Sequence, residues 1–171
     1  MKGLLVTMLV IVAVLVAAFG LAIAFGGPGE PPPMASINNP FKNVDFSDLP
    51  KVSYFPARDG AKLAFRAYPA AGGEVKGCVV LVHGSSASSS SMHLMAKGFA
   101  AAGYGAYALD VRGHGESGTK GHIVYIGQLE DDTEDFVDSI KPARPSTFLG
   151  FSAGGGFVLR FAGSARQKLF L

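Results

Sequence analysis

Residues 147–156 read TFLGFSAGGG and contain the pattern Gly150-x-Ser152-x-Gly154. The pattern lies between a short apolar run, which predicts a strand at 147–150, and residues 153–162, which predict a helix. In that context the serine occupies a sharp strand-to-helix turn, and the glycines let the strand and the helix approach closely. The hydroxyl of Ser152 would then stand above the carboxyl edge of a sheet. A glycine-rich turn without chemistry is the alternative, and the flanking elements disfavour it.

The segments around this turn alternate between strand-like and helix-like patterns. Residues 78–82 read CVVLV, a continuous apolar run typical of a strand buried on both faces. The other predicted elements are strands at 52–56, 62–68 and 104–109, helices at 91–102 and 128–140, a turn at Asp59-Gly60, and a last apolar run at 169–171 that resembles the start of a further strand. This alternation predicts an α/β fold with a mostly parallel sheet and helices on both of its faces. Ligands of such sheets bind beyond the carboxyl ends of the strands.

A second motif, His83-Gly84-Ser85, follows the CVVLV run directly. A loop in this place can supply a backbone N–H to an oxyanion, and Ser85 is the best placed donor, with Ser86 as the alternative. The other serines up to Ser91 fit a polar loop that ends in a helix cap at Ser90 or Ser91.

A third motif, DVRGHGES at 110–117, follows the strand predicted at 104–109. The three motifs, in this order and at this spacing, make the chain resemble the α/β-hydrolase superfamily. Within it, the closest resemblance is to the monoacylglycerol lipase, lysophospholipase and serine aminopeptidase branch, and it runs from about Val52 to the last residue.

This resemblance implies a serine hydrolase of carboxylic esters, in particular lipid-derived esters, that acts through an acyl-enzyme and needs no cofactor or metal. The residues it assigns are Ser152 as the nucleophile, Gly150 and Gly154 as the glycines of the nucleophile turn, Ala153 and Ser85 as oxyanion donors, and His83 and Gly84 as the loop motif. The Arg112–Ser117 loop would shape the pocket wall without a catalytic role. Peptidase or thioesterase chemistry on the same serine is the alternative within the family.

None of the four histidines fits the place of the catalytic base. His83, His93, His114 and His122 all precede Ser152, whereas the family places its histidine after the serine and the acid. We expect His83, His114 and His122 to be loop residues and His93 to lie on a helix. Cys78, inside the buried run, is expected to be a core residue.

Six acidic residues gather in the helix predicted at 128–140: Glu130, Asp131, Asp132, Glu134, Asp135 and Asp138. A metal site would need their carboxylates to converge on one point, but they alternate with apolar positions along a single helix. We therefore interpret them as a solvated helix face and expect no metal.

Residues Leu4 to Phe25 carry no charge and are long enough to cross a bilayer as a helix. Lys2 is the only side-chain cation before Lys42, which favours a cytoplasmic N-terminus and a domain on the extracytoplasmic side. The alternative is a signal peptide cleaved near Ala22-Ile23-Ala24 and a secreted domain. The predicted organisation is an anchor at 1–25, a Pro/Gly-rich tether (26–33) and irregular chain to residue 50, and a hydrolase domain at 51–171.

The overall composition limits the remaining classes of function. A net charge of +2 in 171 residues is too small to indicate nucleic-acid binding. Aromatic and aliphatic residues are too plentiful for a disordered chain. A single cysteine excludes an intramolecular disulfide.

The 19 residues after Ser152 contain no Asp, Glu or His, so the acid and the base of a hydrolase triad are missing from them. We expect the chain to be a fragment, from a split or frameshifted gene or an incomplete sequence, with little activity alone because a serine without a base is a poor nucleophile. The alternative is a non-catalytic anchored module, or one half of a complementing pair whose other part is a C-terminal half.

Overall fold

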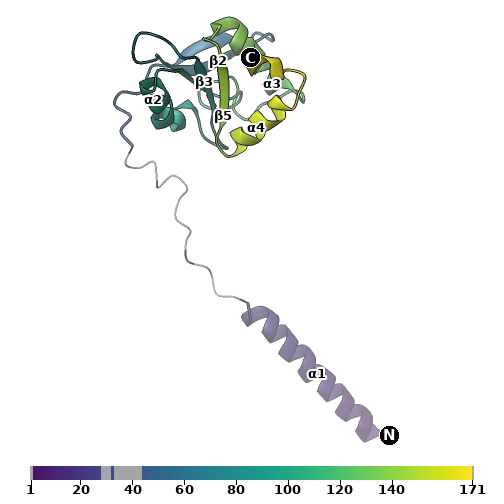
Figure 1. Cartoon of the computed structure of the whole chain (residues 1–171). Coiled ribbons are helices and arrows are strands. Elements are labelled where there is room, and N and C mark those ends of the chain that lie inside the picture. Colours follow the sequence, from purple (N-terminus) through teal and green to yellow (C-terminus); the bar gives the residue numbers. More distant parts are fainter. Residues whose placement is uncertain (1, 28–31, 33–43, 171) are drawn as a thin grey trace. The chain divides into compact units, whose positions relative to one another are not determined.

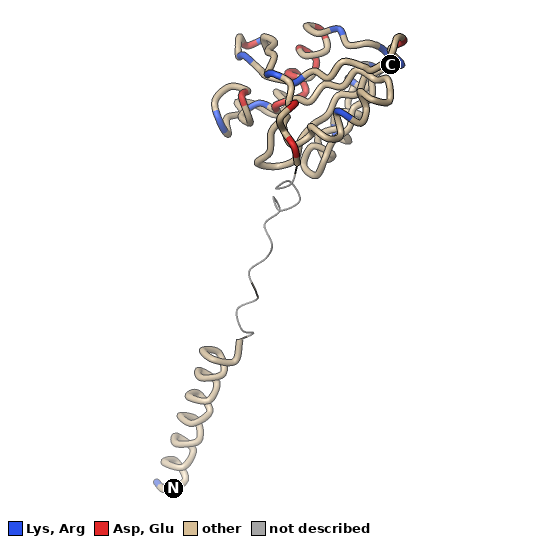
Figure 2. Tube along the Cα trace, turned by 90° about the vertical axis from the view of Figure 1, so that its left-hand side faces the viewer, with Lys and Arg blue, Asp and Glu red and all other residues tan. Residues whose placement is uncertain are grey.

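The structure is a computed structural model that describes residues 2–27, 32 and 44–170 of the chain (Figure 1). It divides into two units, Met1–Lys42 and Asn43–Leu171, each described by itself. The first unit contains helix α1 (Lys2–Phe25), whose side chains are all exposed. Figure 2 shows that this helix carries charge only at its N-terminal end, whereas charges are spread over the second unit. Helix α1 is long and apolar enough to cross a bilayer or to serve as a signal sequence. Most of the predicted tether lies outside the described residues.

The second unit is built on a five-stranded sheet in the order β1-β2-β4-β3-β5. The strands are β1 (Ser53–Pro56), β2 (Lys62–Tyr68), β3 (Cys78–Val82), β4 (Gly105–Leu109) and β5 (Ser146–Gly150). Strand β3 pairs in parallel with both β4 and β5, and the hairpin of β1 and β2 joins β4 in antiparallel pairing. The sheet is therefore mixed, with its parallel part centred on the buried strand that the sequence predicted.

Helices cover both faces of this sheet (Figure 1). They are α2 (His93–Ala101), α3 (Gln128–Ile140) and α4 (Ala153–Ala162), with short 3-10 turns η2 (Ser89–Met92) and η3 (Gln167–Phe170). Alternate residues of β3 point to opposite faces, so Val80 packs with Phe136 of α3 while Leu81 packs with Ala96 of α2. The predicted α/β fold is confirmed.

The largest buried cluster is aromatic and joins α3 to the sheet. Phe136 has no exposed surface, and its ring centroid lies 5.4 Å from those of Phe55 and Phe65 and 5.7 Å from that of Tyr107. Edge-on ring pairs at these distances add to the stability gained from apolar burial. This cluster fixes α3 against the antiparallel side of the sheet.

Two expectations about local structure are wrong. The cap predicted at Ser90 or Ser91 is absent, because those residues lie inside η2 and α2 begins after Met92. The apolar run predicted from residue 169 as the start of a strand begins as η3, a 3-10 turn that contacts β5. An apolar run alone does not separate strand from turn.

Candidate active site

The site predicted from the sequence lies where β5 ends and α4 begins. Ser152 occupies this junction with φ 53° and ψ −117°, and its side chain is exposed. A serine at positive φ costs roughly 1–3 kcal/mol and persists only where its surroundings enforce it. Backbone N–H groups of Gly155 and Gly156 donate to the Ser152 carbonyl oxygen at 2.9 and 3.3 Å. The strained turn thus presents the hydroxyl at the carboxyl edge of the sheet.

Two glycines make this conformation possible. A Cβ on Gly150 would lie 2.1 Å from the carbonyl oxygen of Gly154, and a Cβ on Gly154 would lie 2.3 Å from that of Val82. The N–H of Phe151 donates to the same Val82 oxygen at 3.0 Å. The turn therefore packs backbone against backbone at the end of β3, which leaves no room for a side chain at either position.

The His83-Gly84-Ser85 loop lies beside the serine. A Cβ on Gly84 would be 3.2 Å from Cβ of Ser152 and 3.3 Å from the Phe151 carbonyl oxygen. Ser85 and Ser86 follow at the surface, and Ser86 also has a positive φ of 56°. The first N–H groups of a helix have no partner within it, and Ala153 is the first residue of α4. The two predicted oxyanion donors thus come from segments that meet at Ser152.

His83 holds the loop motif in place through both of its ring nitrogens. Its Nδ1 lies 2.7 Å from the Gly84 carbonyl oxygen, and its Nε2 accepts the N–H of Val111 at 3.1 Å. Burial lowers the pKa of His83. These contacts match a neutral ring with its proton on Nδ1, and they join the loop after β3 to the loop after β4.

Asp110 and Ser117 hold the third motif, residues 110–117, in its conformation through hydrogen bonds. The sequence did not predict this structural role. The Asp110 carboxylate accepts N–H groups of Ser89 at 2.5 Å and Glu116 at 3.0 Å, and a Cβ on Gly115 would lie 2.3 Å from its Cγ. The Ser117 hydroxyl donates to the Asp110 carbonyl oxygen at 2.6 Å and accepts the N–H of Ala64 at 2.8 Å. An Asp directly after a buried strand was the signal available in the sequence.

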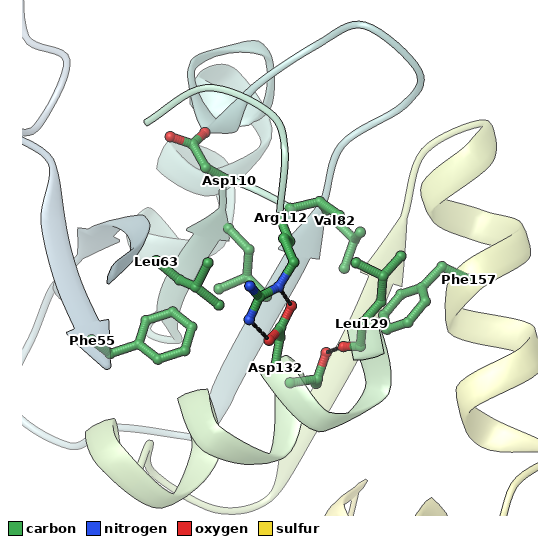
Figure 3. A pocket seen from close by; sticks show the side chains of 11 residues that line it. Phe55, Leu63, Val82, Asp110, Arg112, Leu129, Asp132 and Phe157 are labelled. Atoms are coloured by element: carbon green, nitrogen blue, oxygen red, sulfur yellow. Dashed lines mark hydrogen bonds and ion pairs between the residues drawn. The ribbon is translucent and has the colours of Figure 1, made fainter. Parts of the chain in front are cut away.

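Arg112 of the same motif closes a small cavity beneath this edge (Figure 3). Its guanidinium binds the Asp132 carboxylate in a bidentate pair, with nitrogen–oxygen distances of 2.8 and 2.6 Å, and also contacts Asp59 at 2.9 Å. Burial raises the pKa of Asp132 despite this pairing. The cavity measures about 20 Å³, room for about one water. Arg112 therefore has a structural role beside this cavity, which is too small for an acyl chain.

The interpretation of the acidic residues of α3 as a solvated face is wrong. Glu130, Asp131 and Asp132 are buried, at 5%, 9% and 7% exposure, and only Asp138 of the six is exposed. The ion pairs are Glu130–Arg160 at 2.6 Å, Asp131–Arg58 at 3.1 Å, Asp131–Arg166, Asp132–Arg112 at 2.6 Å, Glu134–Arg58 at 3.0 Å, Glu134–Arg166 at 3.1 Å and Asp135–Arg58 at 3.0 Å. Those four arginines come from three separate regions of the sequence, at position 58, at position 112 and at positions 160–166.

The remaining histidines and Cys78 take the places expected of them. His93 begins α2 and is buried between the Tyr68 hydroxyl at 3.0 Å and the Asp48 carboxylate at 2.9 Å. His114 and His122 lie in the loop after β4. Cys78 is a buried free thiol. Among the described residues, no three His, Cys, Asp or Glu side chains are grouped to hold a metal ion.

Comparisons with known proteins identify the family of the chain. The family model described as serine aminopeptidase, S33 matches residues 73–170. A monoacylglycerol lipase from Mycolicibacterium smegmatis (strain ATCC 700084 / mc(2)155) is 42% identical over 92 residues, which cover 50% of this chain and 32% of that protein. The chain thus spans about a third of the length of this curated relative.

Solved structures share the fold. A soluble variant of monoglyceride lipase from Saccharomyces cerevisiae, in complex with a substrate analog, matches at a TM-score of 0.60 and 27% identity, over 70% of this chain and 41% of that one. An esterase from Exiguobacterium antarcticum matches at a TM-score of 0.57 and 24% identity, over 67% of this chain and 41% of that one. Since the family model covers more than half of the residues, the chain belongs to the serine aminopeptidase S33 family of α/β-hydrolases.

Proposed function

We propose that this hydrolase cleaves carboxylic esters, in particular lipid-derived esters, through an acyl-enzyme on Ser152. The observation that carries the proposal is the strained, exposed conformation of Ser152, at φ 53° between β5 and α4. A backbone of this kind stores strain to present one hydroxyl, which a turn of purely structural purpose does not need. The similarity to a monoacylglycerol lipase favours an ester over a peptide bond, although the family is described as an aminopeptidase.

In the proposed reaction, the Ser152 oxygen attacks the acyl carbonyl carbon while a base takes its proton. The N–H groups of Ala153 and Ser85 stabilise the oxyanion of the tetrahedral intermediate. The intermediate then expels the alcohol, which receives the proton, and water hydrolyses the acyl-serine by the same steps. His83 cannot be the base while its Nε2 accepts the Val111 N–H.

The proton-transfer groups are proposed to lie outside residues 1–171, in a further segment or a second chain, because residues 153–171 contain no Asp, Glu or His. The chain alone then has little or no esterase activity. Loss of triad members costs a serine protease several orders of magnitude in rate. Turnover of p-nitrophenyl esters by purified 1–171, abolished by Ser152→Ala, would refute this part of the proposal.

The role of Ser152 as the nucleophile is tested by adding a segment that supplies an acid and a base after residue 171. Residues 1–171 are fused to the part of the M. smegmatis monoacylglycerol lipase that follows its region of similarity. A fluorophosphonate probe should label this chimera at Ser152, and the Ser152→Ala chimera should stay unlabelled. The neighbouring Ser85→Ala change keeps the backbone N–H and should leave labelling in place. A folded chimera that is not labelled at Ser152 would contradict the assignment.

Helix α1 is proposed to anchor the hydrolase in a membrane with its N-terminus in the cytoplasm and the domain on the other side. Its 24 residues have no buried side chain and a mean hydropathy of 3.0 over their most apolar window. Carbonate extraction of cells that express the chain should leave it in the membrane pellet. Release into the medium as a shortened chain would favour the cleaved signal peptide instead.

A further inference from the structure

The loop between β4 and α3 exposes a run of apolar side chains that the proposed reaction does not use. Ile123, Val124, Tyr125 and Ile126 are consecutive, with exposed fractions of 50%, 68%, 44% and 91%. Soluble proteins normally expose large apolar side chains one at a time, and a contiguous exposed group of them marks an interaction surface. We call residues 123–126 the apolar loop.

The structure holds the apolar loop in this orientation. The N–H of Val124 donates to the side-chain oxygen of Gln128 at 2.7 Å, and Gln128 is buried and binds Asp59 through its amide nitrogen. The Tyr125 hydroxyl donates to the Asp131 carboxylate at 2.7 Å. The polar groups of the loop thus point inward, while Ile123, Val124 and Ile126 remain outside.

The chemistry around the apolar loop fits a lipid surface. Lys120 is exposed and is the only Asp, Glu, Lys or Arg residue between positions 118 and 127. The acids that follow the loop, Glu130 and Asp131, are buried in ion pairs with arginines, so they do not oppose an anionic headgroup. Membrane-surface binding grows with the apolar area that enters the interface and with attraction of cations to anionic lipids, and the apolar loop with Lys120 offers both.

The shape of the apolar loop also favours lipid over protein. Ile126 is 91% exposed, so it protrudes from the surface of the domain. The loop also forms one wall of an open hollow of about 330 Å³, whose other walls include Leu129 and Phe157 and the ion pair of Glu130 with Arg160. Hydrocarbon adapts to a protruding side chain, whereas a protein partner needs a complementary pocket.

We propose that the apolar loop, residues 123–126, inserts into the bilayer interface as a second membrane contact of the hydrolase. This inference rests on the proposed anchoring by α1, which keeps the domain near a membrane. It gives the carboxyl edge of the sheet, where the loop after β4 begins, direct access to lipid substrates.

The test uses tryptophan fluorescence, because the chain contains no tryptophan of its own. Three variants of residues 1–171 are placed in vesicles of phosphatidylcholine and phosphatidylglycerol with brominated acyl chains: Ile126→Trp in the apolar loop, Val75→Trp as the control, and Leu15→Trp in α1. Val75 is 49% exposed and precedes β3, at the opposite edge of the parallel strands. Val124→Trp, at a 68% exposed position, replaces Ile126→Trp if that variant does not fold.

Bromine should quench roughly half of the emission of Trp at position 126, since interfacial side chains enter the boundary of headgroups and acyl chains, and should leave the Val75→Trp variant unchanged. Unquenched emission at 126 with quenched emission at 15 overturns the inference and leaves the anchoring intact. A blue shift at 126 without quenching shows a protein partner or second copy on the loop and also overturns it. Unquenched emission at 15 refutes the anchoring and the inference together. None of these outcomes bears on Ser152, which the labelling of the chimera tests separately.

Discussion

The turn at Ser152 and the acidic residues of α3 are both held by close contacts with segments distant in the sequence, but only the turn is marked by a local sequence motif. At the turn, Gly150 and Gly154 lie two residues from the serine, and β3 adds one backbone carbonyl. At α3, Asp132 pairs with Arg112, and Asp135 pairs with Arg58. The first region is predictable from a short motif, whereas the second depends on pairs that only the folded chain brings together.

The largest loss of stability is expected at Asp132, the buried acid of α3 that pairs with Arg112. Arg112→Ala should lower the free energy of unfolding by about 3–5 kcal/mol, because it leaves the Asp132 carboxylate buried without its bidentate partner. The measurement is urea unfolding of residues 1–171 in detergent, followed by the fluorescence of the five tyrosines, which all lie from position 54 to position 125.

The matched variant for this prediction is Arg112→Ala combined with Asp132→Asn. Removal of the unpaired charge should recover part of the lost stability. A loss of less than about 1 kcal/mol for Arg112→Ala would show that the pair behaves as an exposed ion pair, and the contrast between the two regions would then fail.

A substitution in the Ser152 turn should lower the free energy of unfolding nearly as much. Gly154→Ala forces a Cβ to within 2.3 Å of the Val82 carbonyl oxygen and should cost about 3 kcal/mol in the same unfolding experiment. Gly156→Ala is the matched control, because a Cβ there meets nothing within 4 Å and Ala favours a helix interior over Gly. Equal stability of both variants would show that the close packing of the turn is not a constraint.

This contrast also explains how much the sequence could predict. The bounds of β2, β3, α3 and α4, and the meeting of the His83-Gly84 loop with Ser152, follow from local patterns and the order of the motifs. The burial of α3's acids could not be predicted, because helical periodicity assigns charged residues to solvent when their partners lie far away in the chain. Arg58 and Arg112 stand in loops whose packing against α3 no local pattern records.

A third, smaller loss of stability is expected where His83 joins the loop after β3 to the loop after β4. His83→Ala removes the acceptor of the Val111 N–H and should cost about 2 kcal/mol near neutral pH. Since burial lowers the pKa of His83, the folded chain resists the proton that the unfolded chain accepts below pH 6.5. The contribution of His83 is therefore complete above pH 6.5 and is lost as the pH falls through the folded pKa.

The comparison of parent and variant across pH isolates this contribution. The difference in stability between parent and His83→Ala should shrink from about pH 7.5 to about pH 5. His122→Ala, at an exposed position, is the control and should show only a small difference in stability. A difference that stays constant for His83→Ala would mean that the ring is not held in its neutral form.

The smallest loss of stability is expected for Arg58, a half-exposed side chain that pairs with Asp131, Glu134 and Asp135. The Arg58 side chain is 44% exposed, against 9% for Arg112, so water and salt screen its charge. Arg58→Ala should therefore cost about 1 kcal/mol or less, and the cost should fall further at high salt, in contrast to Arg112→Ala. A loss as large as that of Arg112→Ala, unchanged by salt, would show that burial does not set the strength of these pairs. It would place the acidic residues of α3 as a group, rather than one buried pair, beside the Ser152 turn as a determinant of the fold.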